Sequence, residues 1–67
     1  MKRILISEKI KKYRKENGLT QAAFGIILGV SAQAVSKWES EACYPDITFL
    51  PDIAELIGCG IEELFGA

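Results

Sequence analysis

The stretch Thr20–Glu39, TQAAFGIILGVSAQAVSKWE, decides the fold of this chain. Its apolar residues recur at helical spacing on both sides of Gly29, which predicts two short helices joined by a tight turn. Thr20 and Ser31 stand where side-chain caps would open these two helices. Gly25 is a small residue in the first of them, at the point where the two helices are expected to cross. The stretch is therefore interpreted as a pair of helices set at an angle.

Helical periodicity runs through the rest of the chain, with no sustained alternation of the kind that predicts strands. The sequence therefore predicts an all-α fold, formed by residues 1–67 as a single domain. Thr48 is the expected cap of the fourth helix, because Pro51 then falls in its first turn, where the missing N–H costs little. Five short helices are expected, over residues 6–17, 21–28, 32–39, 49–57 and 61–65.

The apolar positions of these helices predict one shared core. Trp38 lies on the same side of its helix as Val35, so it is expected to pack inward and not to act as a stacking platform. Tyr13 and Cys59 are also expected inside, whereas Cys43 lies in a loop. The other expected core positions are Ile6, Ile10, Asn17, Phe24, Leu28, Leu50, Ile53, Leu56, Ile57, Ile61, Leu64 and Phe65.

Composition argues against several classes of function. The chain has no His, and its two cysteines lack metal-ligand spacing, so neither a metal site nor a cofactor is expected. The sequence contains neither a catalytic cluster nor a glycine-rich phosphate loop, so an enzyme is not expected. It has no apolar run of membrane-spanning length and no signal-peptide pattern, which predicts a cytoplasmic protein without a membrane partner. Two lone thiols fit a reducing cytosol.

The net charge of −1 conceals an asymmetry along the chain. Residues 1–37 hold all eight basic residues and only Glu8 and Glu16 among the acids, a formal charge of +6. Residues 38–67 hold seven acids and no base, a formal charge of −7. The asymmetry fits either two solvated faces of opposite sign or a basic front for phosphate with an acidic back.

Two helices at such an angle form a unit whose second helix can enter the major groove of DNA. Gln33, Ser36 and Lys37 point outward from that second helix, away from Val35 and Trp38. The sequence therefore predicts a sequence-specific binder of duplex DNA. The basic residues expected to add salt-sensitive attraction are Lys2, Arg3, Lys9, Lys11 and Lys12.

Six stretches carry a combined pattern: Glu8–Arg14, Gly18–Gln21, Leu28–Ser31, Gln33–Glu39, Tyr44–Ile47 and Ile53–Leu56. Together they resemble the lambda-type helix-turn-helix proteins, also called the Xre or phage Cro/C1 repressor family. The resemblance runs from Ile6 to Phe65 and implies a compact five-helix, lambda-repressor-like domain with its helix-turn-helix at residues 20–39. It also implies a bacterial or phage transcriptional regulator, most often a repressor. A homodimer on two half-sites about one helical turn apart is the geometric expectation.

The resemblance also implies roles for individual residues. Arg14 and Glu39 match a buried ion pair that ties the first helix to the third. The base-facing positions match Ala32, Gln33, Ser36 and Lys37; a glutamine can bind adenine and a lysine can bind guanine. The start of the second helix matches a phosphate site, because its free N–H groups face the anion. The residues expected at phosphate are Thr20, Gln21, Ser31, Ser40, Lys9 and Lys12.

The chain departs from this family pattern at several positions. Ala32 stands where a long polar or basic residue is common in the family. Glu41 and Ala42 stand where a glycine and a basic residue are usual. On the second helix, outward positions that are usually charged hold Ala22, Ala23 and Ile26, and Ile27 lies at the border of the core. Ile26 and Ile27 form either a surface for self-association or a protein partner, or a contact packed under the first helix. The alternative function is thus a protein-binding module, such as an antitoxin or a regulator's interaction domain, with weak DNA contact.

Overall fold

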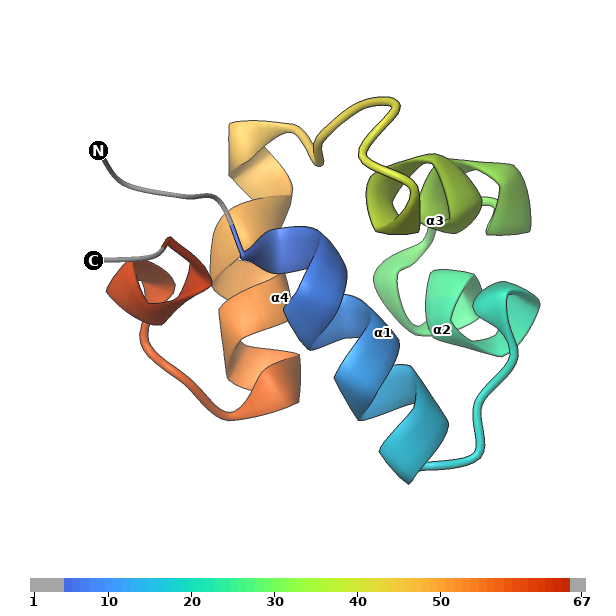
Figure 1. The fold of residues 1–67 in the computed structure, drawn as a ribbon, viewed down its shortest axis with the longest axis horizontal. Helices are drawn as coiled ribbons and strands as arrows, with labels where there is room; N and C mark the ends of the chain where they lie inside the picture. Colours follow the sequence, from blue (N-terminus) through green and yellow to red (C-terminus); the bar gives the residue numbers. More distant parts are fainter. Residues whose placement is uncertain (1–4, 66–67) are drawn as a thin grey trace.

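The computed structural model describes residues 5–65, and its regular elements are helical. Helix α1 runs through the middle of the molecule, with α2 and α3 on one side and α4 on the other (Figure 1). A hydrogen bond from the Leu5 N–H to the Leu64 carbonyl, 2.8 Å long, places the start of α1 beside the last helical turn. The elements are α1 (Ile6–Glu16), α2 (Gln21–Leu28), α3 (Ala32–Glu39), η1 (Ile47–Phe49), α4 (Leu50–Ile57) and η2 (Ile61–Leu64), where η marks a 3₁₀ helix.

The pair α2 and α3 forms as the sequence predicts. The Thr20 hydroxyl accepts a hydrogen bond from the Ala23 N–H at 3.0 Å, and the Ser31 hydroxyl accepts one from the Ala34 N–H at 3.1 Å. Each cap satisfies a backbone donor that the helix itself leaves without a partner. Gly29 ends α2 with φ +78°, a left-handed conformation that favours glycine. The turn between the helices is therefore fixed by local chemistry.

Gly25 allows α2 to approach the segment that leads into α3. A Cβ atom at this position would lie 2.5 Å from the Val30 carbonyl oxygen and 3.2 Å from that of Ser31. The same approach carries a hydrogen bond of 2.8 Å from the Val30 N–H to the Gly25 carbonyl. The expected role of Gly25 is confirmed, because a side chain here would force the backbone apart.

One apolar core holds the elements together. Two aromatic contacts support it: Tyr13 meets Phe24 edge-on at 6.2 Å between ring centroids, and Trp38 lies 5.9 Å from Phe49. Trp38 is buried as predicted, and Tyr13 and Cys59 are half-buried against the core. The buried apolar residues are Ile6, Ile10, Phe24, Val35, Trp38, Ile53, Ala54 and Leu64.

Three predictions at the ends of elements are wrong. The expected fifth helix is η2, a four-residue 3₁₀ turn, so the described residues hold four α-helices and not five. Ile61 opens this turn with 43% of its surface exposed and does not join the core. Asn17 is also exposed, because α1 ends at Glu16 and the helical stripe stops there. Its side-chain amide donates to the Tyr13 carbonyl at 2.8 Å and so caps the helix.

The entry into α4 also differs from the prediction. Thr48 does not cap α4; instead the Asp46 carboxylate caps η1, the turn that leads into α4, and accepts hydrogen bonds from the N–H and hydroxyl of Thr48, both at 3.0 Å. These bonds hold the pKa of Asp46 below its usual value, the backbone bond first. They open η1, after which α4 begins at Leu50. Pro51 falls in the first turn of α4, as expected.

Candidate nucleic-acid interface

Helix α3 has one buried face and one exposed face. Val35, Trp38 and Glu39 are buried against the rest of the molecule. On the other face the side chains recur at three- and four-residue intervals, so they form one stripe along the helix. We call this set the α3 stripe; it consists of Gln33, Ser36, Lys37 and Ser40, all of them exposed.

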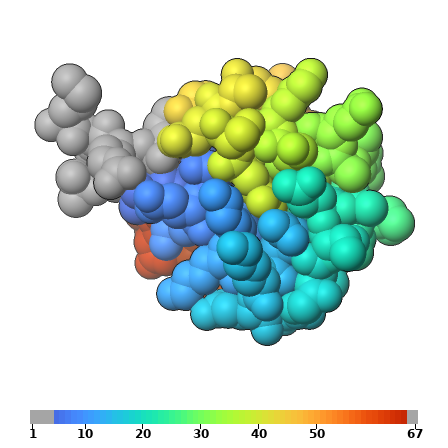
Figure 2. Space-filling model, turned by 45° about the vertical axis from the view of Figure 1, so that its right-hand side comes forward, coloured from blue at the N-terminus to red at the C-terminus, as the bar shows by residue number. Residues whose placement is uncertain are grey.

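The ends of α3 also carry two residues expected at phosphate. Ser31 is exposed, and its hydroxyl is the cap of α3. The Ser40 hydroxyl donates to the Lys37 carbonyl at 3.2 Å and lies at the end of the α3 stripe. Ala32, expected to face a base, is half-buried at the first position of the helix. Figure 2 shows this side of the molecule, where α3 and the following loop lie beside α1.

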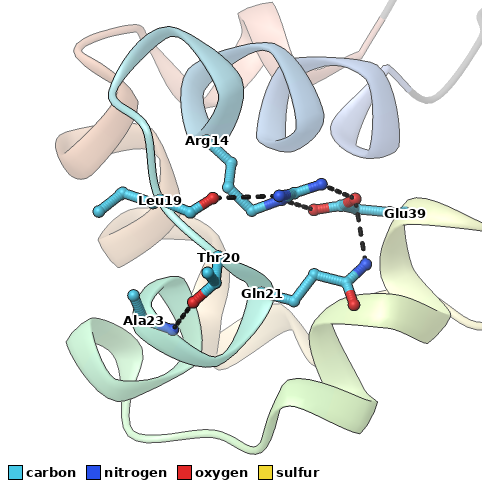
Figure 3. A network of polar contacts seen from close by, with 6 residues as sticks. All are labelled: Arg14, Leu19, Thr20, Gln21, Ala23 and Glu39. Carbon is cyan, nitrogen blue, oxygen red and sulfur yellow. Dashed lines mark hydrogen bonds and ion pairs between the residues drawn. The ribbon is translucent and has the colours of Figure 1, made fainter.

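Arg14 and Glu39 form an ion pair that joins α1 to α3 (Figure 3). Two guanidinium nitrogens of Arg14, Nε and Nη2, donate to the two carboxylate oxygens of Glu39 at 2.7 and 3.0 Å. A third, Nη1, donates to the Leu19 carbonyl at 3.0 Å, in the loop that leads into α2. Arg14 thus has a structural role, and its guanidinium binds the carboxylate in the bidentate geometry that is typical of arginine.

The surroundings of this pair shift both pKa values toward the charged forms. Burial of the Glu39 carboxylate is the strongest single influence and raises its pKa. The hydrogen bonds from Arg14 and Gln21, with the charges of Arg14 and Lys11, together outweigh burial and lower the pKa. The pKa of Arg14 is raised, chiefly by its hydrogen bond to Glu39. The pair is therefore ionised at neutral pH.

Gln21 belongs to the same network. Its side-chain amide donates to a Glu39 carboxylate oxygen at 3.3 Å, so one carboxylate ties α1, α2 and α3 together. The sequence prediction placed Gln21 at phosphate and did not foresee this bond, because 18 residues separate the partners. Beside it, the Thr20 hydroxyl is occupied as the cap of α2. The first-turn N–H groups of α2 thus have their direction fixed relative to α3.

The expected phosphate ligands Lys9 and Lys12 lie elsewhere on α1. Both line a small hollow of about 200 Å³ that also contains Ile57 of α4. Lys12 precedes Arg14 by two residues, so helix geometry sets their side chains about 160° apart, and Lys12 lies on the flank of α1 opposite to the one that meets α3 through Arg14. Besides Arg14, Lys11 is a basic residue whose charge helps to lower the pKa of Glu39. The structure places Lys9 and Lys12 in a hollow shared with α4, and their role at phosphate stays a prediction; Lys2 and Arg3 lie outside the described residues.

Glu41 follows the α3 stripe in an unusual backbone conformation. Its φ is +64°, the one positive value at a non-glycine position among residues 5–65. The side chain is exposed and directly follows Ser40. A carboxylate at this position adds negative charge to the end of the stripe.

Ile26 and Ile27 are exposed on α2, by 78% and 52% of their surface. The hypothesis that they pack under α1 is therefore wrong. They are available for contact with another molecule, at the end of α2 away from Thr20.

The pair α2 and α3, with the exposed α3 stripe on its second helix, has the arrangement of a helix-turn-helix domain. Comparison with known proteins gives the same class. The helix-turn-helix family profile matches residues 10–64. The chain therefore belongs to the lambda-type helix-turn-helix family.

Two characterised relatives are similar to most of this chain. The HTH-type transcriptional activator BcrR of Enterococcus faecalis is 38% identical over 58 residues, which cover 87% of this chain and 28% of BcrR. The Repressor protein C2 of Salmonella phage P22 is 33% identical over 60 residues, which cover 90% of this chain and 28% of C2. The chain thus spans little more than a quarter of either relative.

Two solved structures of the P22 protein are similar in shape. The crystal structure of the c2 repressor in complex with synthetic operator 9T in the presence of Tl⁺ superposes with a TM-score of 0.79, at 33% identity over 90% of this chain and 91% of that one. The solution structure of its DNA-binding domain gives a TM-score of 0.75, at the same identity, over 90% of this chain and 79% of the other.

Proposed function

We propose that this chain binds duplex DNA sequence-specifically, with α3 in the major groove, as part of a bacterial or phage transcriptional regulator. The observation that carries the proposal is the α3 stripe, four exposed polar side chains on a helix whose opposite face is locked into the core. The similar P22 repressor was crystallised with a synthetic operator, which supports the same role here. Such a chain acts where the chromosome or phage genome lies, in the cytoplasm.

The chemistry of the α3 stripe suits base recognition. The Gln33 amide can both donate to and accept from an adenine edge, and the Lys37 ammonium can donate to guanine O6 and N7. The Ser36 hydroxyl can pair with either kind of group. Ala32 offers only a methyl group, which suits the methyl of thymine. An eight-residue helix is about 12 Å long, comparable with the width of the groove.

The surrounding groups position α3 on the DNA backbone. The N–H groups of the first turn of α2 are aimed by the Glu39 network and suit one phosphate. Ser31, Ser40 and Lys11 lie at the ends and side of α3 and suit neighbouring phosphates. Phosphate contacts of this kind fix register, and the base contacts of α3 then supply specificity.

A homodimer on two half-sites fits this geometry. One α3 offers few base contacts, and two copies about 10 base pairs apart would read a two-fold symmetric site. The two relatives are named an activator and a repressor. We assign repression to this chain, by occupation of a site that polymerase needs.

Paired lysine substitutions test the proposal. Lys11→Ala should weaken binding to all duplexes about equally and reduce the slope of log K against log salt by about 1, as a phosphate ligand does. Lys37→Ala should cost about 1–3 kcal/mol and relax the preference at one base position. Lys12→Ala is the matched control and should have a smaller effect than Lys11→Ala. Equal losses for Lys37 and Lys12 would contradict the assignment of α3.

The exposed Ile26 and Ile27 favour a second candidate function, a protein-binding module with weak DNA contact. This candidate predicts micromolar or weaker DNA binding with no sequence preference. The salt series separates the two functions, because binding to phosphate falls steeply with salt and apolar protein binding does not.

A further inference from the structure

A second surface lies between α2 and α4. It is an open hollow of about 560 Å³, lined by the apolar residues Ile27, Leu28 and Leu56 and by the acidic residues Asp52 and Glu55. Ile26, exposed by 78%, is the neighbour of Ile27 on α2. We call this surface the α2–α4 hollow. None of its lining residues belongs to α3 or to the first turn of α2, so it remains open when α3 is engaged.

The apolar part of the hollow lacks a role in the core. Ile27 keeps 52% of its surface in contact with solvent, and Leu28 and Leu56 are only half-buried. Helices on a protein surface normally present polar residues outward, and α2 presents Ala22, Ile26 and Ile27 instead. Contiguous exposed apolar surface beside polar groups is typical of interaction sites.

The acidic part of the hollow specifies the charge of its occupant. Asp52 and Glu55 lie one turn apart on α4, and both are exposed. Neither carboxylate has a hydrogen bond or ion pair within residues 5–65, and no lysine or arginine lines the hollow. A second copy docked here symmetrically would bring the Asp52 and Glu55 carboxylates of both copies, four negative charges, into one interface without a basic residue from the hollow. An occupant with positive charge is favoured over self-association.

We propose that the α2–α4 hollow docks a basic amphipathic segment of another protein. One aliphatic or aromatic side chain of that segment packs on Ile27, Leu28 and Leu56. A lysine or arginine three or four residues away pairs with Asp52 and Glu55. This proposal does not depend on DNA binding, because the hollow and the α3 stripe share no residue.

A random 12-residue peptide library, displayed on phage and selected on the full chain, tests the proposal. Enriched peptides should share an apolar residue with Lys or Arg three or four positions from it. A labelled synthetic copy should lose at least tenfold in affinity with Ile27→Asp, and at least fivefold with Asp52→Lys combined with Glu55→Lys. Ile47→Asp is the matched control: Ile47 is 75% exposed but lies outside the hollow, so affinity should not change.

Three results would overturn the proposal. Enriched peptides could lack basic residues, or they could bind Ile27→Asp as well as wild type while circular dichroism shows both folded. In sedimentation, a dimer that Ile27→Asp turns into a monomer would identify the occupant as a second copy. The DNA affinity of wild type is measured in parallel; a wild-type chain that selects such peptides but binds no duplex DNA would contradict the proposed function and leave this docking site standing.

Discussion

The two halves of the molecule hold their helices in different ways. In residues 5–40, hydrogen bonds from Arg14 and Gln21 to Glu39 connect three helices, and side chains cap both α2 and α3. In residues 41–65, α4 has no side-chain cap, and apolar packing around Ile53 and Leu64 fixes its place. Hydrogen bonds are directional and apolar contacts are not. The half that would read DNA is therefore the half in which directional hydrogen bonds fix the angles between the helices.

Removal of the Glu39 carboxylate should have the largest effect on this contrast. Glu39→Ala leaves the half-buried guanidinium of Arg14 without its partner, and we expect a loss of about 3 kcal/mol in the free energy of unfolding. Glu55→Ala is the control in the other half and should change it by less than about 0.5 kcal/mol. Urea unfolding followed by circular dichroism measures both.

A double variant sharpens the same comparison. Arg14→Met with Glu39→Leu replaces both charges by apolar groups and should recover much of the loss. If the double substitution costs the sum of the two single substitutions Arg14→Met and Glu39→Leu, the two side chains are not coupled, and the pair itself is not what stabilises the three helices.

Gly25→Ala should have the next largest effect. Its methyl group would lie 2.5 Å from the Val30 carbonyl oxygen, so α2 and the turn must separate, at a cost of about 2 kcal/mol. Gly29→Ala is the control: no atom lies within 4 Å of its added carbon, and its φ of +78° should cost only about 1 kcal/mol. Thermal unfolding compares the two, and equal costs would mean that the close approach is not tight.

Glu41→Gly should change stability less and in the opposite direction. Glycine suits a φ of +64°, so we expect a gain of about 1 kcal/mol. It also removes a negative charge beside the α3 stripe, so DNA affinity should rise. Glu41→Gln separates the effects, because it removes the charge and keeps the strain: affinity should rise without a gain in melting temperature. Unchanged affinity in both variants would place Glu41 away from the DNA.

Lowering the pH should gradually reduce the stabilisation that the Glu39 network gives to residues 5–40. The pKa of Glu39 in the folded chain lies below its usual value of 4.5, so its ion pair is fully present above that value and is lost as the pH falls through the folded pKa. The difference in stability between wild type and Glu39→Gln should therefore shrink below about pH 4.5. The effect is smaller than that of Glu39→Ala, because a neutral carboxyl still forms hydrogen bonds. A constant difference down to pH 2 would contradict the depressed pKa.

Local features of this chain could be predicted from sequence, and distant ones could not. Contacts between neighbouring residues form the caps at Thr20 and Ser31 and the turn at Gly29, so the local sequence is enough to predict them. The bond from Gln21 to Glu39 spans 18 residues and has no local signal. The position of Lys12 beside Ile57 depends on how α1 packs against α4, which a local pattern does not show.

Errors at Asn17 and Ile61 have a related cause. In the sequence, both residues continue the apolar spacing of a helix, but α1 ends at Glu16 and the last helix is a 3₁₀ turn. The exposure of Ile26 could not be decided for the same reason: a helical wheel shows which residues share a face, and not which face is covered.

Selection of random duplex DNA on the purified chain tests the central claim most directly, with Gln33→Ala and Lys37→Ala selected in parallel. The account predicts that wild type enriches a two-fold symmetric motif and that each variant relaxes particular positions within it. No enrichment even at low salt, or the same motif from both variants, would contradict the assignment of α3 as the helix that reads the bases.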